Sequence, residues 1–237
     1  SAIMAYADEH NIIVVPQGGN TGFMGGATPD ESGNTILLSL RRMNKVRDFD
    51  KKNMSMTVEA GCILQNLQDI AEDSGLYFPL NLAAKGSCTI GGNLGTNAGG
   101  LNVVRYGTTR ALTLGLEVVL MGGEILDMLG GLRKDNTGYD LRDLFIGSEG
   151  TLGIITAATM RLFPKPVAVS TAFAEVRDVD AAVELLHRAQ AASGGMVEAF
   201  ELIPADIMHV LFEAFPNIQH PLATIGEMNV LIEIGST

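Results

Sequence analysis

The sequence contains no tryptophan, only two cysteines, and no apolar run long enough to cross a membrane. Cys62 and Cys88 lack CxxC spacing, so they predict neither a zinc site nor a disulfide framework, and we interpret them as reduced, partly buried thiols. No segment resembles a signal peptide, which favours the cytoplasm or, in a eukaryote, the mitochondrial matrix. Histidines are few and form no HxxxH or HxH pair, so no metal site is predicted in this chain: His10, His187, His209 and His220.

Positive charge is also scarce. Sixteen Lys and Arg residues face 27 Asp and Glu residues, which gives a formal net charge of −11. Nucleic-acid phosphates are held by clustered Lys and Arg, so this balance argues against a nucleic-acid partner. The 237 residues suffice for one or two domains with a substantial core.

Short apolar runs alternate with helical stretches through the first two thirds of the chain. The sequence predicts a helix before residue 11, a helix over 63–75 and a Gly-Gly hairpin within 114–127. Three further runs are short and apolar or alternating, which is typical of strands: 11–15, 35–40 and 55–60. Residues 150–166 are rich in strand formers and end in two prolines, Pro164 and Pro166, which indicate a domain boundary.

The pattern after that boundary is an alternation of strands and longer helices. Strands are predicted over 169–176, 196–203 and 229–236. Helices are predicted over 178–195, with Asp178 at its start and Gly194 at its end, and over 204–215. The last strand is expected to be an unpaired edge, which favours a chain that continues past Thr237.

Glycine is abundant, and its distribution is uneven. Twelve of the 28 glycines fall in two windows, 18–33 and 86–100. Glycine packed this densely costs backbone entropy, so something must approach the bare backbone closely. A dinucleotide phosphate could be held there by main-chain N–H groups. A tight hairpin, a flexible linker or a long glycine-rich turn are the alternatives.

Known phosphate-binding motifs do not decide between these explanations of the glycine clusters. Neither GxGxxG nor GxxxxGK[ST] occurs, so the Rossmann fingerprint and the Walker A loop are absent. Small neutral donors between the glycines suit an anion site in an acidic protein, and they are Asn20, Thr21, Ser87, Thr89, Asn93, Thr96 and Asn97.

Three motifs in order carry a resemblance to a known family. They are "VVPQGGNTG" (14–22), "FPLNLAAKGSCTIGGNLGTNAGGLNVVRYG" (78–107) and "LRKDNTGYDLRDLFIGSEGTLGIITAATMRLFPKP" (132–166). The chain resembles the FAD-binding domain of the vanillyl-alcohol oxidase or PCMH-type flavoproteins. Within them it is most similar to the D-2-hydroxyacid dehydrogenase branch, which includes D-2-hydroxyglutarate dehydrogenase, D-lactate dehydrogenase and the glycolate oxidase FAD subunit.

The resemblance implies an α+β fold, with a PCMH-type FAD-binding domain over 1–166 that lacks its first part and the beginning of an α+β cap domain over 167–237. It implies three groups of cofactor-binding residues. The pyrophosphate loop comprises Gly18, Gly19, Asn20, Thr21 and Gly22. The flavin-lining segment comprises Gly86, Ser87, Thr89, Ile90, Gly91, Gly92, Thr96, Asn97, Gly99 and Gly100. The adenosine end comprises Glu149, Gly150, Gly153, Ile154 and Ile155.

The implied reaction is oxidation of a small D-2-hydroxy acid to the 2-oxo acid by hydride transfer to FAD. No histidine lies in either glycine cluster, so we interpret the flavin as non-covalent. The family's catalytic groups and a divalent metal belong to a region beyond Thr237, so no catalytic residue is assigned and this chain alone is expected to be inactive. A downstream electron acceptor, protein or quinone, and a homodimer are compatible with the family. The alternative is a non-catalytic flavin-binding module that needs a partner.

Overall fold

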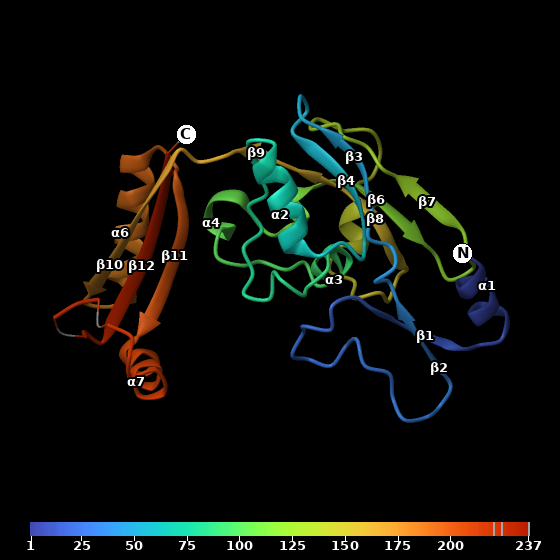
Figure 1. Cartoon of the computed structure of the whole chain (residues 1–237), viewed down its shortest axis with the longest axis horizontal. Coiled ribbons are helices and arrows are strands. Elements are labelled where there is room, and N and C mark those ends of the chain that lie inside the picture. The colour runs from blue at the N-terminus through green and yellow to red at the C-terminus, as the bar shows by residue number, and fades with distance from the viewer. Residues whose placement is uncertain (220, 224, 237) are drawn as a thin grey trace. The chain divides into compact units, whose positions relative to one another are not determined.

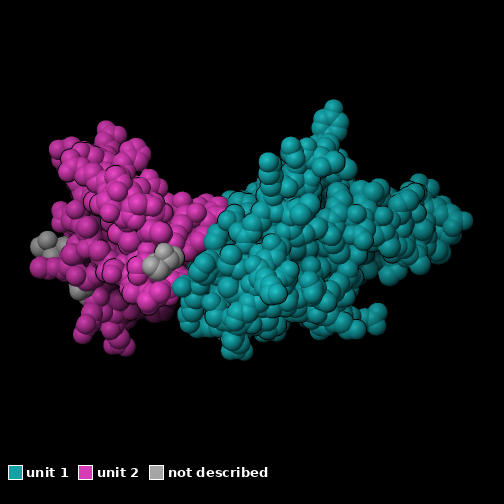
Figure 2. Space-filling view, turned by 90° about the horizontal axis from the view of Figure 1, so that it is seen from above, with its two compact units in different colours: residues 1–100, 108–165 teal, residues 101–107, 166–237 magenta. Residues whose placement is uncertain are grey.

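The computed structural model describes residues 1–219, 221–223 and 225–236. The chain forms two compact units, shown in different colours in Figure 2. The first unit contains residues 1–100 and 108–165, and the second contains residues 101–107 and 166–237. The second unit is therefore discontinuous in sequence, because a seven-residue internal segment belongs to it. The secondary structure is a mixture of helices and mainly antiparallel sheets, which confirms the predicted α+β class.

A five-stranded antiparallel sheet is the centre of the first unit (Figure 1). Its strands follow the spatial order β3 (Val46–Asp50), β4 (Ser55–Glu59), β8 (Ile154–Arg161), β6 (Thr113–Val119) and β7 (Ile125–Met128). The central strand β8 is buried along nearly its whole length, whereas the edge strand β7 alternates between exposed and half-buried residues. The predicted Gly-Gly hairpin joins β6 to β7, and the N–H of Gly123 donates to the Leu120 carbonyl at 2.9 Å.

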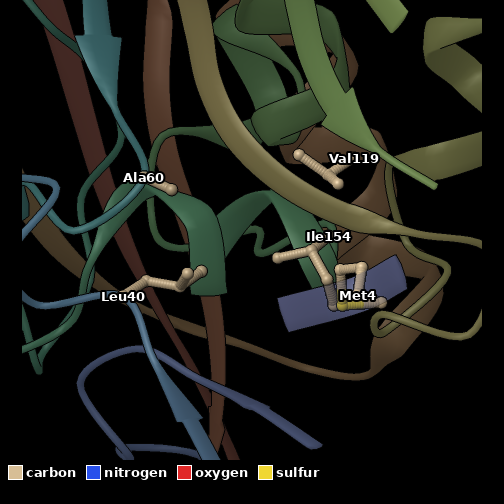
Figure 3. Close-up of a cluster of buried hydrophobic side chains, with 5 residues drawn as sticks. All are labelled: Met4, Leu40, Ala60, Val119 and Ile154. Atoms are coloured by element: carbon tan, nitrogen blue, oxygen red, sulfur yellow. The ribbon is translucent and has the colours of Figure 1, made fainter. Parts of the chain in front are cut away.

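A second, parallel pair of strands lies near the N-terminus. Helix α1 (Ala2–Glu9) leads into β1 (Ile13–Gln17), which pairs with β2 (Thr35–Ser39). Figure 3 shows the buried cluster that joins this region to the large sheet, formed by Met4, Leu40, Ala60, Val119 and Ile154. Each of these side chains is less than 9% exposed. The cluster fixes the end of β2 and the start of β8 against the same core.

Helix α2 (Leu64–Asp73) is close to the predicted helix over 63–75. Its buried face carries Leu64, Leu67 and Ala71, whereas Ile70 is 37% exposed. The chain leaves the helix through Gly75 with a φ of +75°, a left-handed conformation that favours glycine. The remaining short elements of this unit are β5 (Leu76–Tyr77), α3 (Ile90–Gly95), η1 (Thr109–Leu112), α5 (Arg142–Phe145) and β9 (Phe163–Pro164).

The second unit is a three-stranded antiparallel sheet with α6 (Val179–Ser193) packed against it. Figure 1 shows β12 (Met228–Ser236) between β10 (Ala168–Val176) and β11 (Val197–Pro204). The other helices are α4 (Val103–Tyr106) and α7 (Ala205–Ala214). The apolar core of this unit contains Ala182, Leu185, Leu186, Ala189, Val197, Val230 and Ile232.

The predicted unpaired edge at the end of the chain is wrong. β12 pairs with β10 along one side and with β11 along the other, so it is the central strand of its sheet. The sequence pattern identifies a strand but says nothing about its neighbours, because pairing partners 24 to 68 residues away leave no local mark. Because β12 is paired on both sides, it does not support the expectation that the chain continues past Thr237.

Candidate cofactor-binding site

The two glycine-rich clusters pack directly against each other. A Cβ atom on Gly19 would lie 2.1 Å from the carbonyl oxygen of Ser87, and one on Gly18 would lie 2.2 Å from Oγ1 of Thr89. No real Cβ atom approaches a neighbour so closely, so both positions require glycine. What lies against the first cluster is therefore, in part, the backbone of the second.

The third motif joins the same place. The N–H groups of Gly147 and Glu149 donate to the carbonyls of Leu94 and Gly95, each at 2.9 Å. Residues from all three motifs thus surround the short helix α3. Their convergence is imposed by main-chain hydrogen bonds and close backbone packing within the first unit.

The contact between the third motif and β1 is equally close. A Cβ atom on Gly150 would lie 2.5 Å from Cγ of Pro16, and the φ of Gly150 is +83°. Glu149 itself has a φ of +53°, a left-handed conformation that non-glycine residues rarely adopt. Two tight constraints at adjacent residues hold the turn into β8 in one shape.

Helix α3 within the second cluster was not predicted. Gly91 in its first turn donates its N–H to the Ala60 carbonyl at 2.8 Å, and a Cβ at this position would lie 2.6 Å from Cβ of Ala60. Glycine disfavours helices by about 1 kcal/mol relative to Ala, so the local sequence argues against a helix here. Tertiary packing on the core of Figure 3 overrides that preference.

Other glycines of the predicted site are less crowded. A Cβ atom on Gly22 would meet nothing within 4 Å, and one on Gly92 would lie 3.6 Å from Oγ1 of Thr89. Gly86 and Ser87 are exposed, and Thr21 is half-buried. Asn20 and Asn97 have φ values of +53° and +48°. This surface of bare backbone and small polar groups is open to a ligand.

Thr89 has the feature expected of a site that is completed by a ligand. The residue is 3% exposed, and its hydroxyl has no hydrogen-bond partner among the described residues. Buried polar atoms are nearly always paired, with protein or with an ordered partner, so an unpaired hydroxyl between two glycine clusters fits an anion or a water bound there. The residues present therefore fit a phosphate-bearing cofactor.

Some predicted residues are placed so that only their main chain could meet a cofactor. The side chains of Ile90, Ile154 and Ile155 are at most 6% exposed and lie in the core. Gly153 is buried, and a Cβ there would lie 2.7 Å from Cγ1 of Val118. The side chains of these residues therefore belong to the core, and only their main chain is available to a cofactor.

The remaining predicted residues lie at the far end of α3. The hydroxyl of Thr96 donates to the Gly92 carbonyl at 3.0 Å, and Oδ1 of Asn97 accepts from the N–H of Arg110 at 3.0 Å. Gly99 is half-buried, and a Cβ on Gly100 would lie 2.2 Å from the Asn81 carbonyl oxygen.

An open pocket of about 430 Å³ adjoins this region in the first unit. Four of its lining residues belong to the predicted set, namely Gly19, Gly86, Ser87 and Thr89. The others were missed and come from the loop after β2, the start of β3, the turn before α2, and α2 itself: Arg41, Asn44, Val46, Gly61, Cys62, Ile63, Asn66, Leu67 and Ile70. No motif marks them, because they are brought together only by the fold.

Both cysteines are free thiols, and both are fully buried, whereas the sequence predicted partial burial. Burial raises the pKa of the Cys62 thiol and of the Cys88 thiol, so both stay protonated at neutral pH. A protonated thiol is a poor nucleophile.

The first part of the third motif does not join the cluster around α3. Residues 132–140 are exposed, and Asp135, Thr137 and Asp140 line a separate pocket of about 260 Å³. Within 1–219, 221–223 and 225–236, no group of three His, Cys, Asp or Glu side chains could hold a metal ion. Across the same residues no helix is long and apolar enough to span a membrane.

Comparisons with known proteins identify relatives of this chain. D-2-hydroxyglutarate dehydrogenase of Arabidopsis thaliana, named as mitochondrial, is 44% identical over 98% of this chain and 41% of its own length. The Danio rerio protein of the same name is 48% identical over 89% of this chain and 39% of its own length. D-2-hydroxyglutarate–pyruvate transhydrogenase of Saccharomyces cerevisiae is 40% identical over 98% of this chain and 47% of its own length. The chain thus spans less than half of these relatives.

Solved structures show the same fold at lower identity. A structure of alkyldihydroxyacetonephosphate synthase matches 99% of this chain and 44% of its own with a TM-score of 0.79 at 21% identity. The family model described as "FAD binding domain" matches residues 1–129, which is more than half of the chain. The chain therefore belongs to the FAD binding domain family of PCMH-type flavoproteins.

Proposed function

We propose that this chain is the FAD-binding part of an oxidoreductase that oxidises a D-2-hydroxy acid to the 2-oxo acid. The observation that carries the proposal is the meeting of three glycine-bearing motifs around α3, beside a buried hydroxyl without a partner. The names of the relatives support the D-2-hydroxy acid as the substrate class. Residues 1–166 would be the FAD-binding domain, and residues 167–237 would begin a cap domain.

The chain's own residues would bind the cofactor mainly through neutral groups. The backbone from Asn20 to Gly22 and at Gly86 would offer N–H groups to phosphate oxygens, and the Thr89 hydroxyl would be a further donor. Bound FAD would supply the hydride acceptor for substrate oxidation. The main chain of Glu149, Gly150 and Gly153 to Ile155 would border the adenosine end.

The flavin in this proposal is non-covalent. The family's divalent metal, its catalytic groups and the downstream electron acceptor would lie outside residues 1–237. Two of the relatives described above are named as mitochondrial, which supports the mitochondrial matrix in a eukaryote and leaves the cytoplasm for a bacterial protein. A homodimer is part of the same proposal.

The alternative function is a flavin-binding module without turnover that a partner completes. One experiment separates the two. The FAD-loaded protein that carries this chain is mixed anaerobically with D-2-hydroxyglutarate, D-lactate or glycolate, and the flavin absorbance is followed.

Bleaching by D-2-hydroxyglutarate or D-lactate but not by the same acid's L-enantiomer would support the oxidoreductase. Stable FAD binding without bleaching by any acid would support the module. Failure to bind FAD at all would overturn both.

A further inference from the structure

We propose that Arg41 makes the pocket beside Gly19 an anion-binding site and that its guanidinium binds a phosphate group of the flavin cofactor. The identity of that anion rests on the proposed function, whereas the anion site itself rests on the pocket. Arg41 lies outside all three motifs.

The charge of the pocket lining is the first step of the argument. Among the described residues that line it, Arg41 alone carries a charge at neutral pH. The polar remainder is neutral and consists of Asn44, Asn66, Ser87 and Thr89. A lining with one positive charge is notable in a protein whose net charge is −11. The pocket therefore selects for a negatively charged ligand.

The second step is that this guanidinium is free to bind. Arg41 forms no ion pair or hydrogen bond within the part of the chain that the structure describes. Arg47, on the next strand, is by contrast bound to Glu59 at 3.3 Å and to Glu117 at 2.9 Å. A guanidinium presents several N–H donors in a fork that matches phosphate oxygens, so a phosphate would satisfy it.

The third step is the match of shape and donors. The pocket volume of about 430 Å³ falls in the range of small-ligand sites, about 300–1,000 Å³. Thr89, whose buried hydroxyl has no partner among the described residues, lines the same pocket as Arg41, and so does Gly19 of the first motif. A phosphate held here would be bound by one charged fork and the backbone of a glycine.

The test compares Arg41→Ala with Arg42→Ala. Arg42 is the adjacent arginine, is also exposed, and does not line the pocket. Dissociation constants for FAD and for riboflavin, which has no phosphate, are measured by flavin fluorescence. We expect Arg41→Ala to weaken FAD binding by about 10- to 100-fold, the scale of a lost hydrogen bond to a charged group, and to leave riboflavin binding unchanged. Arg42→Ala should change neither constant.

Equal FAD affinity in Arg41→Ala and the unchanged protein would overturn the proposal, and so would an equal loss of FAD and riboflavin affinity. Arg41→Lys keeps the charge without the fork and should fall between the unchanged protein and Arg41→Ala. Arg41→Lys also replaces Arg41→Ala as the test variant if Arg41→Ala does not fold.

Calorimetric titration with inorganic diphosphate separates this proposal from the proposed function. Arg41-dependent diphosphate binding without FAD binding would keep the anion site and reject the flavin. FAD binding that is independent of Arg41 would keep the flavin and reject the site. Absence of both kinds of binding would overturn both proposals.

Discussion

The Arg105 guanidinium lies 2.5 Å from Oε1 of Glu198, and the two side chains are only 12% and 4% exposed. The hydroxyl of Tyr106 donates to the same carboxylate oxygen at 3.0 Å. This buried ion pair fastens the short segment 101–107 to β11 and makes it part of the second unit. Removing either partner would leave the other charge buried and unpaired, which strongly lowers the free energy of unfolding.

We expect Glu198→Ala to destabilise the second unit by about 3–5 kcal/mol, because it leaves the Arg105 charge buried without a counter-ion. Urea unfolding followed by circular dichroism measures the change. Glu201→Ala, at a half-buried position on the same strand, is the control and should cost much less. Equal losses in the two variants would contradict the role given to the ion pair.

A second prediction concerns Gly19. A methyl group at this position would collide with the Ser87 carbonyl, so Gly19→Ala should lower the free energy of unfolding by about 1–3 kcal/mol and reduce FAD binding. Gly22→Ala is the matched control, because a Cβ there meets nothing within 4 Å. The two variants are compared by thermal unfolding and flavin fluorescence. If Gly19→Ala proves as stable as Gly22→Ala, the close packing of the two clusters is wrong.

The pH dependence of stability gives a third prediction. The hydrogen bonds from Arg47 hold the pKa of Glu117 below its usual value of 4.5, and the hydroxyl of Thr156 contributes to the same effect. Because the folded-state pKa is depressed, Glu117 stabilises the protein fully above pH 4.5, and that contribution is lost as the pH falls through the folded-state pKa. Urea unfolding from neutral pH into this acidic range should show the loss.

Glu117→Gln should remove this part of the pH dependence, since the neutral amide does not titrate. Glu213→Gln, on the exposed surface of α7, should leave the acid slope as it is in the unchanged protein. An acid slope that Glu117→Gln leaves unaltered would assign the effect to other carboxylates.

The fourth prediction concerns attachment of the flavin. Neither glycine cluster contains a histidine, and both cysteines are buried protonated thiols, so FAD should be released by acid or heat. The denatured polypeptide is separated from the supernatant and both absorbance spectra are recorded. Yellow colour that stays with the polypeptide would contradict non-covalent binding.

Local signals predicted the elements whose ends are defined by chemistry in the chain itself. Asp178 and Gly194 marked the two ends of α6, and the structure confirms both, with the Ala181 N–H donating to Asp178 at 2.8 Å and Gly194 at a φ of +65°. These caps depend on neighbours within one turn, so a sequence window contains all the information.

Features that depend on distant partners could not be predicted in this way. Helix α3 forms against the preference of its glycines because Gly91 packs on Ala60, 31 residues earlier. The segment 101–107 joins the second unit through a carboxylate 93 residues away from Arg105. Arg41 lies in the pocket for the same reason, since the chain folds back to bring α2 and Ser87 beside it.

The place of β12 has a consequence for the order in which the protein is made. β10 and β11 do not pair with each other, and each forms its strand pairing with β12. β12 is the last of the three strands to be synthesised. The strands and helices of the first unit are complete by residue 165, about 60 residues before β12 begins. During synthesis the segment 101–107 must therefore wait, with Arg105 uncompensated, until β11 and then β12 have emerged. A nascent chain halted before residue 228 should hold a folded first unit and an unfolded second one, and proteases should cut it after Lys165.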